Sequence, residues 1–322
     1  GFRDEVQVMS NVMSVDGEND PDVLSITGAS AALMISGMPF RGPIAAVRVG
    51  MIGGELVLMP TVQQQEESTL DLIVAGSQTA VLMIEGFADQ LPEKEMGDAI
   101  MFAHQQVQTL CKLQDDLVKE LGIDRPEIPV PVDNPFEKLL ASAGSKLLSA
   151  KTSGEKKDRS GQVRDLKASL EEEFFPDDAE ETKDGLTRSQ FSDAFYKLEG
   201  KVVRDLLLSG KRLDGRAPGD LREVSCEVSR IPKVHGSAVF TRGETQSLAT
   251  IALGTTRDQQ RSDGLFGEQA DRFMLHYYFP SFSVGECRPI RGPGRREIGH
   301  GCLAERSVKP VIPDSDKFPY TI

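Results

Sequence analysis

The chain contains 322 residues, of which 39% are hydrophobic and 27% are charged, a balance typical of a globular protein with more than one domain. Its net charge of -13 and isoelectric point near 4.9 exclude a uniformly basic surface, so a site for a polyanion must be local. No apolar run approaches the roughly 18 residues that a membrane-spanning helix needs, so we expect no membrane partner.

The four cysteines are scattered, with no Cys-x-x-Cys spacing: Cys111, Cys226, Cys287 and Cys302. This pattern argues against a zinc site or a disulfide framework and favours a reducing compartment, and we expect a cytoplasmic protein. The first residue is not methionine, and the chain opens inside an alternating segment. We therefore expect an internal piece of a longer protein.

Alternating apolar residues predict several strands in the first third of the chain, at 5–15, 44–51, 55–60 and twice within 70–88. A polar turn is expected at 16–22 and a hairpin turn at Gly53 and Gly54. A run rich in small apolar residues predicts a helix at 23–38 that packs against a sheet.

A long helix is predicted at 92–121, between Pro92 and Gly122. Its apolar stripe is formed by residues three or four positions apart: Met96, Ile100, Ala103, Val107, Leu110, Leu117 and Leu121. For His104, within this helix, we expect a helix-face histidine with no ligand role.

The middle of the chain changes character after a proline-rich break at 122–135, which predicts a linker or domain edge. Residues 136–208 are charged and helical in pattern, with a mobile segment expected at 152–161. The clearest helix is predicted at 189–210, and its apolar stripe consists of Phe191, Phe195, Leu198, Val202 and Leu206. Charged helices of this kind are usually solvated scaffolding.

From residue 211 the pattern predicts strands with turns at Asp214–Gly215 and Arg242–Gly243, and another strand-rich run at 274–285. A basic stretch follows at 287–309, with six Lys/Arg among glycines and prolines, which we expect to be a loop leading into a short helix near 302. Guanidinium groups on such a segment can bind a polyanion, since glycines let the backbone approach it.

Several motifs in this order resemble the polynucleotide phosphorylase family: RLDGR at 212–216, GSAVFTRGETQ at 236–246, HYYFPSFSVGE at 276–286 and GRREIGHG at 294–301. The run at 28–50 resembles the back half of that family's first RNase PH domain. The resemblance implies an α+β fold with two partial RNase PH-like domains, at 1–122 and 211–322. An all-α linker domain is implied between them, at 123–210.

The resemblance also implies a phosphorolytic 3′-to-5′ exoribonuclease of RNA degradation and mRNA turnover. In that family inorganic phosphate attacks the 3′ end of RNA and nucleoside diphosphates leave. Such enzymes form a ring-shaped homotrimer, use Mg²⁺, carry KH and OB-type RNA-binding modules and can join other RNA-degradation proteins.

The first RNase PH-like half is expected to be catalytically degenerate. Where the family's phosphate-binding serine loop should lie, this chain has Asp20 and Asp22, two carboxylates that repel phosphate. Where the family's Asp-x5-Asp-x-Lys metal motif should lie, Asp71 remains, but Gln65 and Ile73 replace the other two residues. We expect this half to serve ring assembly and RNA contact.

For the second half, the resemblance places Arg295, Arg296 and His300 in the active centre, where fixed positive charge stabilises phosphoryl transfer. The family's serine-rich loop and metal carboxylates would lie beyond Ile322, so no metal ligands are expected within the chain, and the chain alone is expected to be inactive. Taken without the resemblance, Arg295, Arg296 and Glu297 would be interpreted as a surface ion-pair cluster.

Further RNA contacts are expected from Arg242, Gln246 and Arg291. For Arg242 an alternative stays open, in which residues 242–244 form a tight hairpin turn that needs its glycine. The RLDGR motif is expected to be structural, and His235 and His276 have no neighbours at ligand spacing.

Two other functions fit the pattern less well. One is a non-catalytic ring subunit that binds RNA or scaffolds a degradation complex. The other is a stand-alone tRNA-trimming enzyme of RNase PH type, which the predicted linker helices and the fused first domain disfavour.

Overall fold

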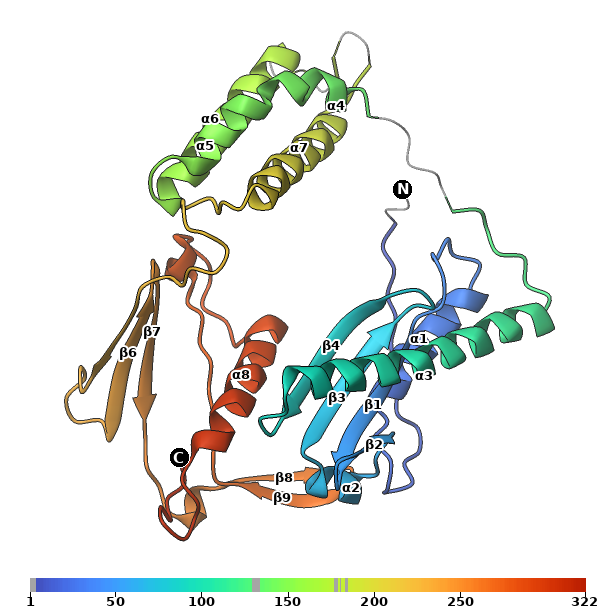
Figure 1. Cartoon of the computed structure of the whole chain (residues 1–322), viewed down its shortest axis with the longest axis vertical. Helices are drawn as coiled ribbons and strands as arrows, with labels where there is room; N and C mark the ends of the chain where they lie inside the picture. Colours follow the sequence, from blue (N-terminus) through green and yellow to red (C-terminus); the bar gives the residue numbers. More distant parts are fainter. Residues whose placement is uncertain (1–3, 129–133, 177–178, 180, 183–184) are drawn as a thin grey trace. The chain divides into compact units, whose positions relative to one another are not determined.

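A computed structural model describes residues 4–128, 134–176, 179, 181, 182 and 185–322 (Figure 1). The chain forms two compact units: the first contains Gly1–Pro129, Ile231–Ser237 and Thr250–Ile322, and the second Val130–Arg230 and Ala238–Ala249. The predicted α+β class is confirmed, with sheets, flanking helices and an all-helical segment. The domain boundaries at residues 122 and 210 stay predictions. The predicted break at 122–135 lies partly outside the described residues.

A four-stranded antiparallel sheet with strand order β2-β1-β3-β4 is the centre of residues 4–128. Its strands are β1 (Ala45–Ile52), β2 (Glu55–Leu58), β3 (Leu70–Gly76) and β4 (Val81–Ala88). All four were predicted from the alternation of apolar residues. Gly53 and Gly54 connect β1 to β2 with φ of 60° and 86°, left-handed values that favour glycine in a tight hairpin.

Two helices cover opposite faces of this sheet, α1 (Asp22–Ile35) and α3 (Glu93–Glu120) (Figure 1). Both were predicted. Strand β1 lies between them, and seven of its eight residues are buried. The short helix α2 (Val62–Glu67) was not predicted; a capping box at Thr61 begins it.

The buried stripe of α3 is displaced from the predicted one. Ala103 and Val107 are buried as expected, but Leu117 and Leu121 are exposed. The remaining buried positions are Ala99, His104, Cys111, Gln114 and Val118. Toward the end of the helix the buried side carries Cys111, Gln114 and Val118, and Leu117 and Leu121 lie beside it, on the exposed side.

The strand predicted at 5–15 is wrong, because these residues form no helix or strand. Their apolar side chains are exposed, with Met9 at 75% and Met13 at 91%. Alternation alone does not make a strand; it needs a partner for the backbone and a core for one face. The described residues provide neither.

The second unit contains a helical assembly: α4 (Phe136–Leu139), η1 (Leu140–Ala143), α5 (Gly144–Thr152), α6 (Lys156–Phe174) and α7 (Arg188–Leu208). Its core is aromatic, with Phe136, Phe175, Phe191 and Phe195 buried. Helix α7 was predicted with its Phe191 and Phe195 stripe. The mobile segment predicted at 152–161 is largely helical, since α6 begins at Lys156.

The last third of the chain contains a three-stranded sheet in the order β5 (Val224–Val228), β6 (Gly236–Arg242) and β7 (Thr245–Ile251). A separate hairpin joins β8 (Gln260–Gly264) to β9 (Gly267–Asp271). Three short 3-10 helices lie in the same part: η3 (Thr256–Asp258), η4 (Ser281–Val284) and η5 (Lys309–Val311).

The strand-rich run predicted at 274–285 is wrong, because these residues form the short helix η4 and otherwise irregular backbone, with no strand. Tyr278 and Phe282 are 68% and 79% exposed, so no core organises this aromatic segment into a sheet. Ile322 lies beside the start of this segment: the Met274 N–H donates to the Ile322 carbonyl at 3.0 Å, and the Ile322 N–H donates to the Arg272 carbonyl.

Candidate active site

The second half of the predicted basic loop is a helix, α8 (Arg295–Val308). The loop prediction is therefore wrong from residue 295 onward, and the helix starts seven residues before the position expected near 302. Gly294 is the N-cap, with extended backbone, and Arg295 and Arg296 are the first two helical residues. Glycines in GRREIGHG suggested a loop, but one at the N-cap starts a helix well.

The carboxylate of Glu297 completes the start of α8. Its Oε2 accepts a hydrogen bond from the Gly294 N–H at 2.8 Å, and its Oε1 accepts one from the Phe279 N–H at 3.0 Å. These two backbone donors, Gly294 first, lower the pKa of Glu297 below its ordinary value. The carboxylate binds amides and not guanidinium groups, so the structure does not contain the alternative ion-pair cluster.

Arg295 and Arg296 are consequently available to a ligand. Within the described part of the chain, neither guanidinium has an ion pair or a hydrogen bond, and both residues are exposed. They lie at the positive end of the helix dipole, where unpaired N–H groups also favour anions. Two full charges and the helix terminus together favour the binding of a phosphate group here.

His300 lies one turn after Arg296, on the same side of α8. Its ring contacts Tyr277 edge-on, with 5.4 Å between ring centroids and an angle of 75°. The next residue, Gly301, is buried against the same tyrosine, since a Cβ there would lie 3.4 Å from the Tyr277 Cβ. This close approach fixes the imidazole beside the arginine pair.

The three residues predicted to contact RNA are all exposed, and their contact with RNA stays a prediction. Arg291 lies in the irregular segment before α8. Arg242 ends β6, and Gln246 in β7 donates its amide to the Thr241 hydroxyl at 3.2 Å. Gly243 between them has φ of 59°, so the hairpin-turn interpretation of this motif is confirmed.

The RLDGR motif forms a self-contained turn, as expected of a structural element. Arg216 Nε donates to the Asp214 carboxylate at 3.0 Å, and the Arg212 N–H donates to the Arg216 carbonyl at 2.9 Å. The hydrogen bond from Arg216 lowers the pKa of Asp214.

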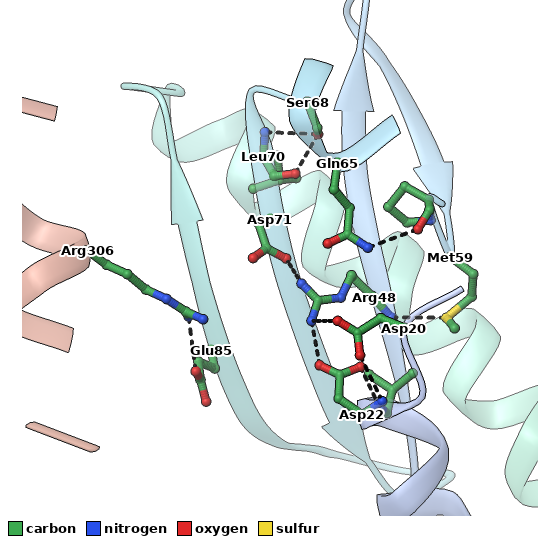
Figure 2. A network of polar contacts seen from close by, with 12 residues as sticks. Asp20, Asp22, Arg48, Met59, Gln65, Ser68, Leu70, Asp71, Glu85 and Arg306 are labelled. Carbon is green, nitrogen blue, oxygen red and sulfur yellow. Dashed lines mark hydrogen bonds and ion pairs between the residues drawn. The ribbon is translucent and has the colours of Figure 1, made fainter. Parts of the chain in front are cut away.

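Three carboxylates of residues 4–128 lie around Arg48 of β1, a residue that the sequence analysis missed. Figure 2 shows its guanidinium between Asp22, at the start of α1, and Asp71 of β3, with Asp20 at 3.7 Å from Nη2. Arg48 pairs with Ile73 across the sheet, which makes Asp71 its diagonal neighbour on the same face. A single arginine within the apolar strand AAVRVGM was the signal that could have found it.

This arrangement is an internal ion cluster. The Arg48 side chain is only 8% exposed, whereas the three carboxylates are 31–39% exposed. Burial alone would lower the pKa of the guanidinium, but Asp71 and Asp22 outweigh it and raise the pKa above its ordinary value. Arg48 therefore stays charged and holds α1 to the sheet.

The residues of this cluster do not fit Mg²⁺. Arg48 donates a hydrogen bond to the Oδ1 of Asp71, and the Gln65 amide donates to the Pro60 carbonyl at 3.1 Å. A bound guanidinium repels a divalent cation at the one remaining acid of the motif. Among the described residues, no group of three or more His, Cys, Asp or Glu side chains is arranged to hold a metal.

Two of the other histidines serve the fold. His104 is 8% exposed, and its Nε2 lies 3.0 Å from the Ser77 carbonyl at the turn between β3 and β4. His235 accepts a hydrogen bond from the Leu253 N–H at its Nδ1, 2.8 Å away. These contacts agree with the absence of a ligand role predicted for His104.

Three family models match successive parts of the chain. Residues 42–106 match domain 2 of the 3′ exoribonuclease family, and residues 220–322 match domain 1 of that family. Between them, residues 136–217 match the RNA-binding domain of polyribonucleotide nucleotidyltransferase. The order is the one that the sequence motifs predicted: the back half of one repeat, a helical domain, and the front half of the next.

Curated relatives match along the whole chain. A polyribonucleotide nucleotidyltransferase of Rhodopirellula baltica is 50% identical over 323 aligned residues, covering 100% of this chain and 43% of the relative. Those of Thermus thermophilus and Syntrophomonas wolfei are 45% and 44% identical, with 100% of this chain and 46% and 45% of the relatives covered. The chain belongs to the polyribonucleotide nucleotidyltransferase family.

Within this family the chain spans less than half the length of the curated relatives that it matches. The helical segment with the aromatic core is the part that matches the family's RNA-binding domain. In the part of the chain that the structure describes, no helix is both long enough and apolar enough to cross a membrane.

Proposed function

We propose that the full-length protein degrades RNA from its 3′ end by phosphorolysis, with the start of α8 as part of its active centre. The observation that carries the proposal is the pair of unengaged guanidinium groups, Arg295 and Arg296, at a helix N-terminus with His300 one turn away. Family membership supports the same reaction, because the relatives are named polyribonucleotide nucleotidyltransferases.

The reaction transfers one nucleotidyl group. A phosphate oxygen forms a bond to the phosphorus of the terminal phosphodiester while the bond from phosphorus to the preceding 3′ oxygen breaks. The proton of hydrogen phosphate neutralises that oxygen, and a nucleoside diphosphate leaves. Three anionic groups meet at the reacting phosphorus, so the protein must supply positive charge.

Arg295 and Arg296 suit this requirement. Their guanidinium groups can bind the RNA phosphate and the attacking phosphate through paired N–H donors, and the helix dipole adds to the attraction. His300, held by Tyr277, can donate a hydrogen bond to a phosphate oxygen. Each lost charge-assisted hydrogen bond costs about 1.5–3 kcal/mol, or roughly ten- to a hundredfold in rate.

We propose that the first RNase PH-like part, residues 1–122, has no catalytic activity and serves assembly and RNA contact. Arg48 lies among Asp20, Asp22 and Asp71, which stand at the positions that the resemblance assigns to the phosphate loop and the metal motif. We propose further that the protein forms a homotrimer in the cytoplasm, that its substrates are RNA 3′ ends and phosphate, and that it acts in mRNA turnover with other RNA-degradation proteins. Mg²⁺ is proposed as cofactor, with ligands outside this chain.

The test is phosphate-dependent release of ADP from poly(A) by the full-length protein. Arg296→Ala and His300→Ala are each expected to lower the rate about ten- to a hundredfold. Arg288→Ala is the matched control, because that arginine lies in the same basic stretch but is already paired with Glu286. Wild-type rates for both site variants would remove these residues from the site. Absence of ADP release by the wild-type protein would favour the non-catalytic RNA-binding subunit.

A further inference from the structure

One carboxylate, that of Glu297, joins two segments that are far apart in sequence. Its Oε2 accepts from the N–H of Gly294, the residue immediately before Arg295. Its Oε1 accepts from the N–H of Phe279, 18 residues earlier in the chain. Both distances, 2.8 and 3.0 Å, are those of good hydrogen bonds.

The segment that Glu297 holds is the one that contacts His300. The Tyr277 and Phe279 rings are stacked, with 6.4 Å between centroids and 7° between planes, and the edge of Tyr277 meets His300. The two residues are two positions apart in a segment that forms no helix or strand, and their rings stack, so fixing the Phe279 amide also restrains the Tyr277 ring. Glu297 thus determines the position of the arginine pair on one side and of the imidazole on the other.

Both carboxylate oxygens of Glu297 accept hydrogen bonds from backbone amides, and the carboxylate makes no ion pair with Arg295 or Arg296. An acid beside two arginines would ordinarily pair with one of them and lower its attraction for phosphate. Here both carboxylate oxygens already have N–H donors. The lowered pKa of Glu297 agrees with this geometry, since the Gly294 and Phe279 amides donate to the ionised form of the carboxylate.

We infer that Glu297 is a positioning residue for the phosphate site: it sets the relative placement of Arg295, Arg296 and His300 without touching the reacting groups. This inference rests on the proposed function. A displacement of about 1 Å in a catalytic group can lower a rate by roughly a hundredfold. Loss of the two hydrogen bonds of Glu297 should therefore lower the reaction rate measurably.

The first arm of the test measures structure, by hydrogen exchange of the Gly294 and Phe279 amides in the full-length protein. Glu297→Ala is expected to speed the exchange of both amides. Glu305→Ala is the matched control, since it removes the same charge from the same helix and no side-chain partner of Glu305 is found among the described residues. Unchanged exchange in Glu297→Ala would overturn the inference.

The second arm measures kcat/KM for phosphate in the ADP-release assay. Glu297→Ala is expected to lower it about ten- to a hundredfold at an unchanged thermal midpoint. Glu297→Gln keeps one acceptor oxygen and is expected to fall between that variant and the wild type, and Glu305→Ala to match the wild type. Partial rescue by glutamine separates positioning from a simple loss of charge, because both variants remove the charge.

The outcomes separate this inference from the proposed function. Normal wild-type turnover with unchanged Glu297→Ala turnover overturns the inference alone. A wild-type protein that releases no ADP overturns the proposed function, and the inference with it. If Glu297→Ala does not fold, Glu297→Gln decides: wild-type kcat/KM for phosphate in that variant overturns the inference, and a clear loss supports it.

Discussion

At the scale of single residues, Arg48 shows how a buried arginine can serve the fold. Its guanidinium is buried, yet it contacts carboxylates from α1, from the segment before it, and from β3 (Figure 2). A buried charge must be paired, and these carboxylates are its only ion-pair partners within the described residues. Asp20 and Asp22, interpreted from sequence as repelling phosphate, are thus also needed to balance Arg48.

Replacing Arg48 by methionine should destabilise the first unit by about 3 kcal/mol, near the low end for breaking a buried ion pair, because the carboxylates left behind are partly hydrated. The measurement is hydrogen exchange of the slowest amides of β1 and β3. Arg41→Met is the control, since Arg41 is exposed and has no partner within the described residues. Equal protection in both variants would show that Arg48 does not hold α1 to the sheet.

Glu297 should titrate below its ordinary pKa of 4.5, because Gly294 and Phe279 donate to the ionised form. With the folded pKa lowered, its contribution to stability is fully present above the ordinary value and is lost as the pH falls through the folded value. The carboxyl ¹³C shift of Glu297, assigned with Glu297→Gln, measures this directly. A midpoint at or above 4.5 would contradict the capping geometry.

At the scale of elements, sequence patterns predicted those whose partners follow closely in the chain. Strands β1 to β4 form consecutive or nearby pairs, α3 and α7 have apolar stripes, and α1 follows from its run of small apolar residues. The strands expected at 5–15 and 274–285 failed because alternation does not reveal whether a partner strand exists. The start of α8 was missed because its glycines suggested a loop and its cap is a glutamate at the third helical position.

Only part of the candidate site could be predicted from the sequence. Arg295, Arg296 and His300 follow from the resemblance, whereas Glu297 and Tyr277 do not, since their contacts depend on how two distant segments meet. Arg48 was recognisable only as an oddity in an apolar strand. Glu297 and Tyr277 lie within motifs of the resemblance, but the sequence does not show which contacts they make.

Phe191 should be the residue on which the helical assembly depends most. It is fully buried and its ring lies within 6.3 Å, centroid to centroid, of four other phenylalanine rings. Phe191→Ala is expected to cost about 3–5 kcal/mol, as for other buried aromatic residues. Hydrogen exchange in α4 to α7 measures this loss. Tyr196→Ala on the same helix is the control, because Tyr196 is 77% exposed, and an equal effect of both would contradict the assigned core.

At the scale of the whole molecule, two parts of the chain, residues 4–128 and 211–322, differ in how their charged side chains are arranged. In the first part, a buried arginine lies among three carboxylates, which carry more negative charge than it can balance. In the second part, Arg295 and Arg296 have no ion pair among the described residues, and the nearby Glu297 binds backbone amides. Phosphoryl transfer needs uncompensated positive charge, which supports the proposal that the activity belongs to the second part and assembly and RNA contact to the first.

The most direct measurement compares Asp71→Ala with Arg296→Ala in the full-length protein, by ADP release from poly(A) in the presence of phosphate. Asp71→Ala should keep nearly all of the wild-type rate, and Arg296→Ala should lose about ten- to a hundredfold. Abolished phosphorolysis in a folded, correctly assembled Asp71→Ala protein, with full activity of Arg296→Ala, would contradict the division of roles between the two halves.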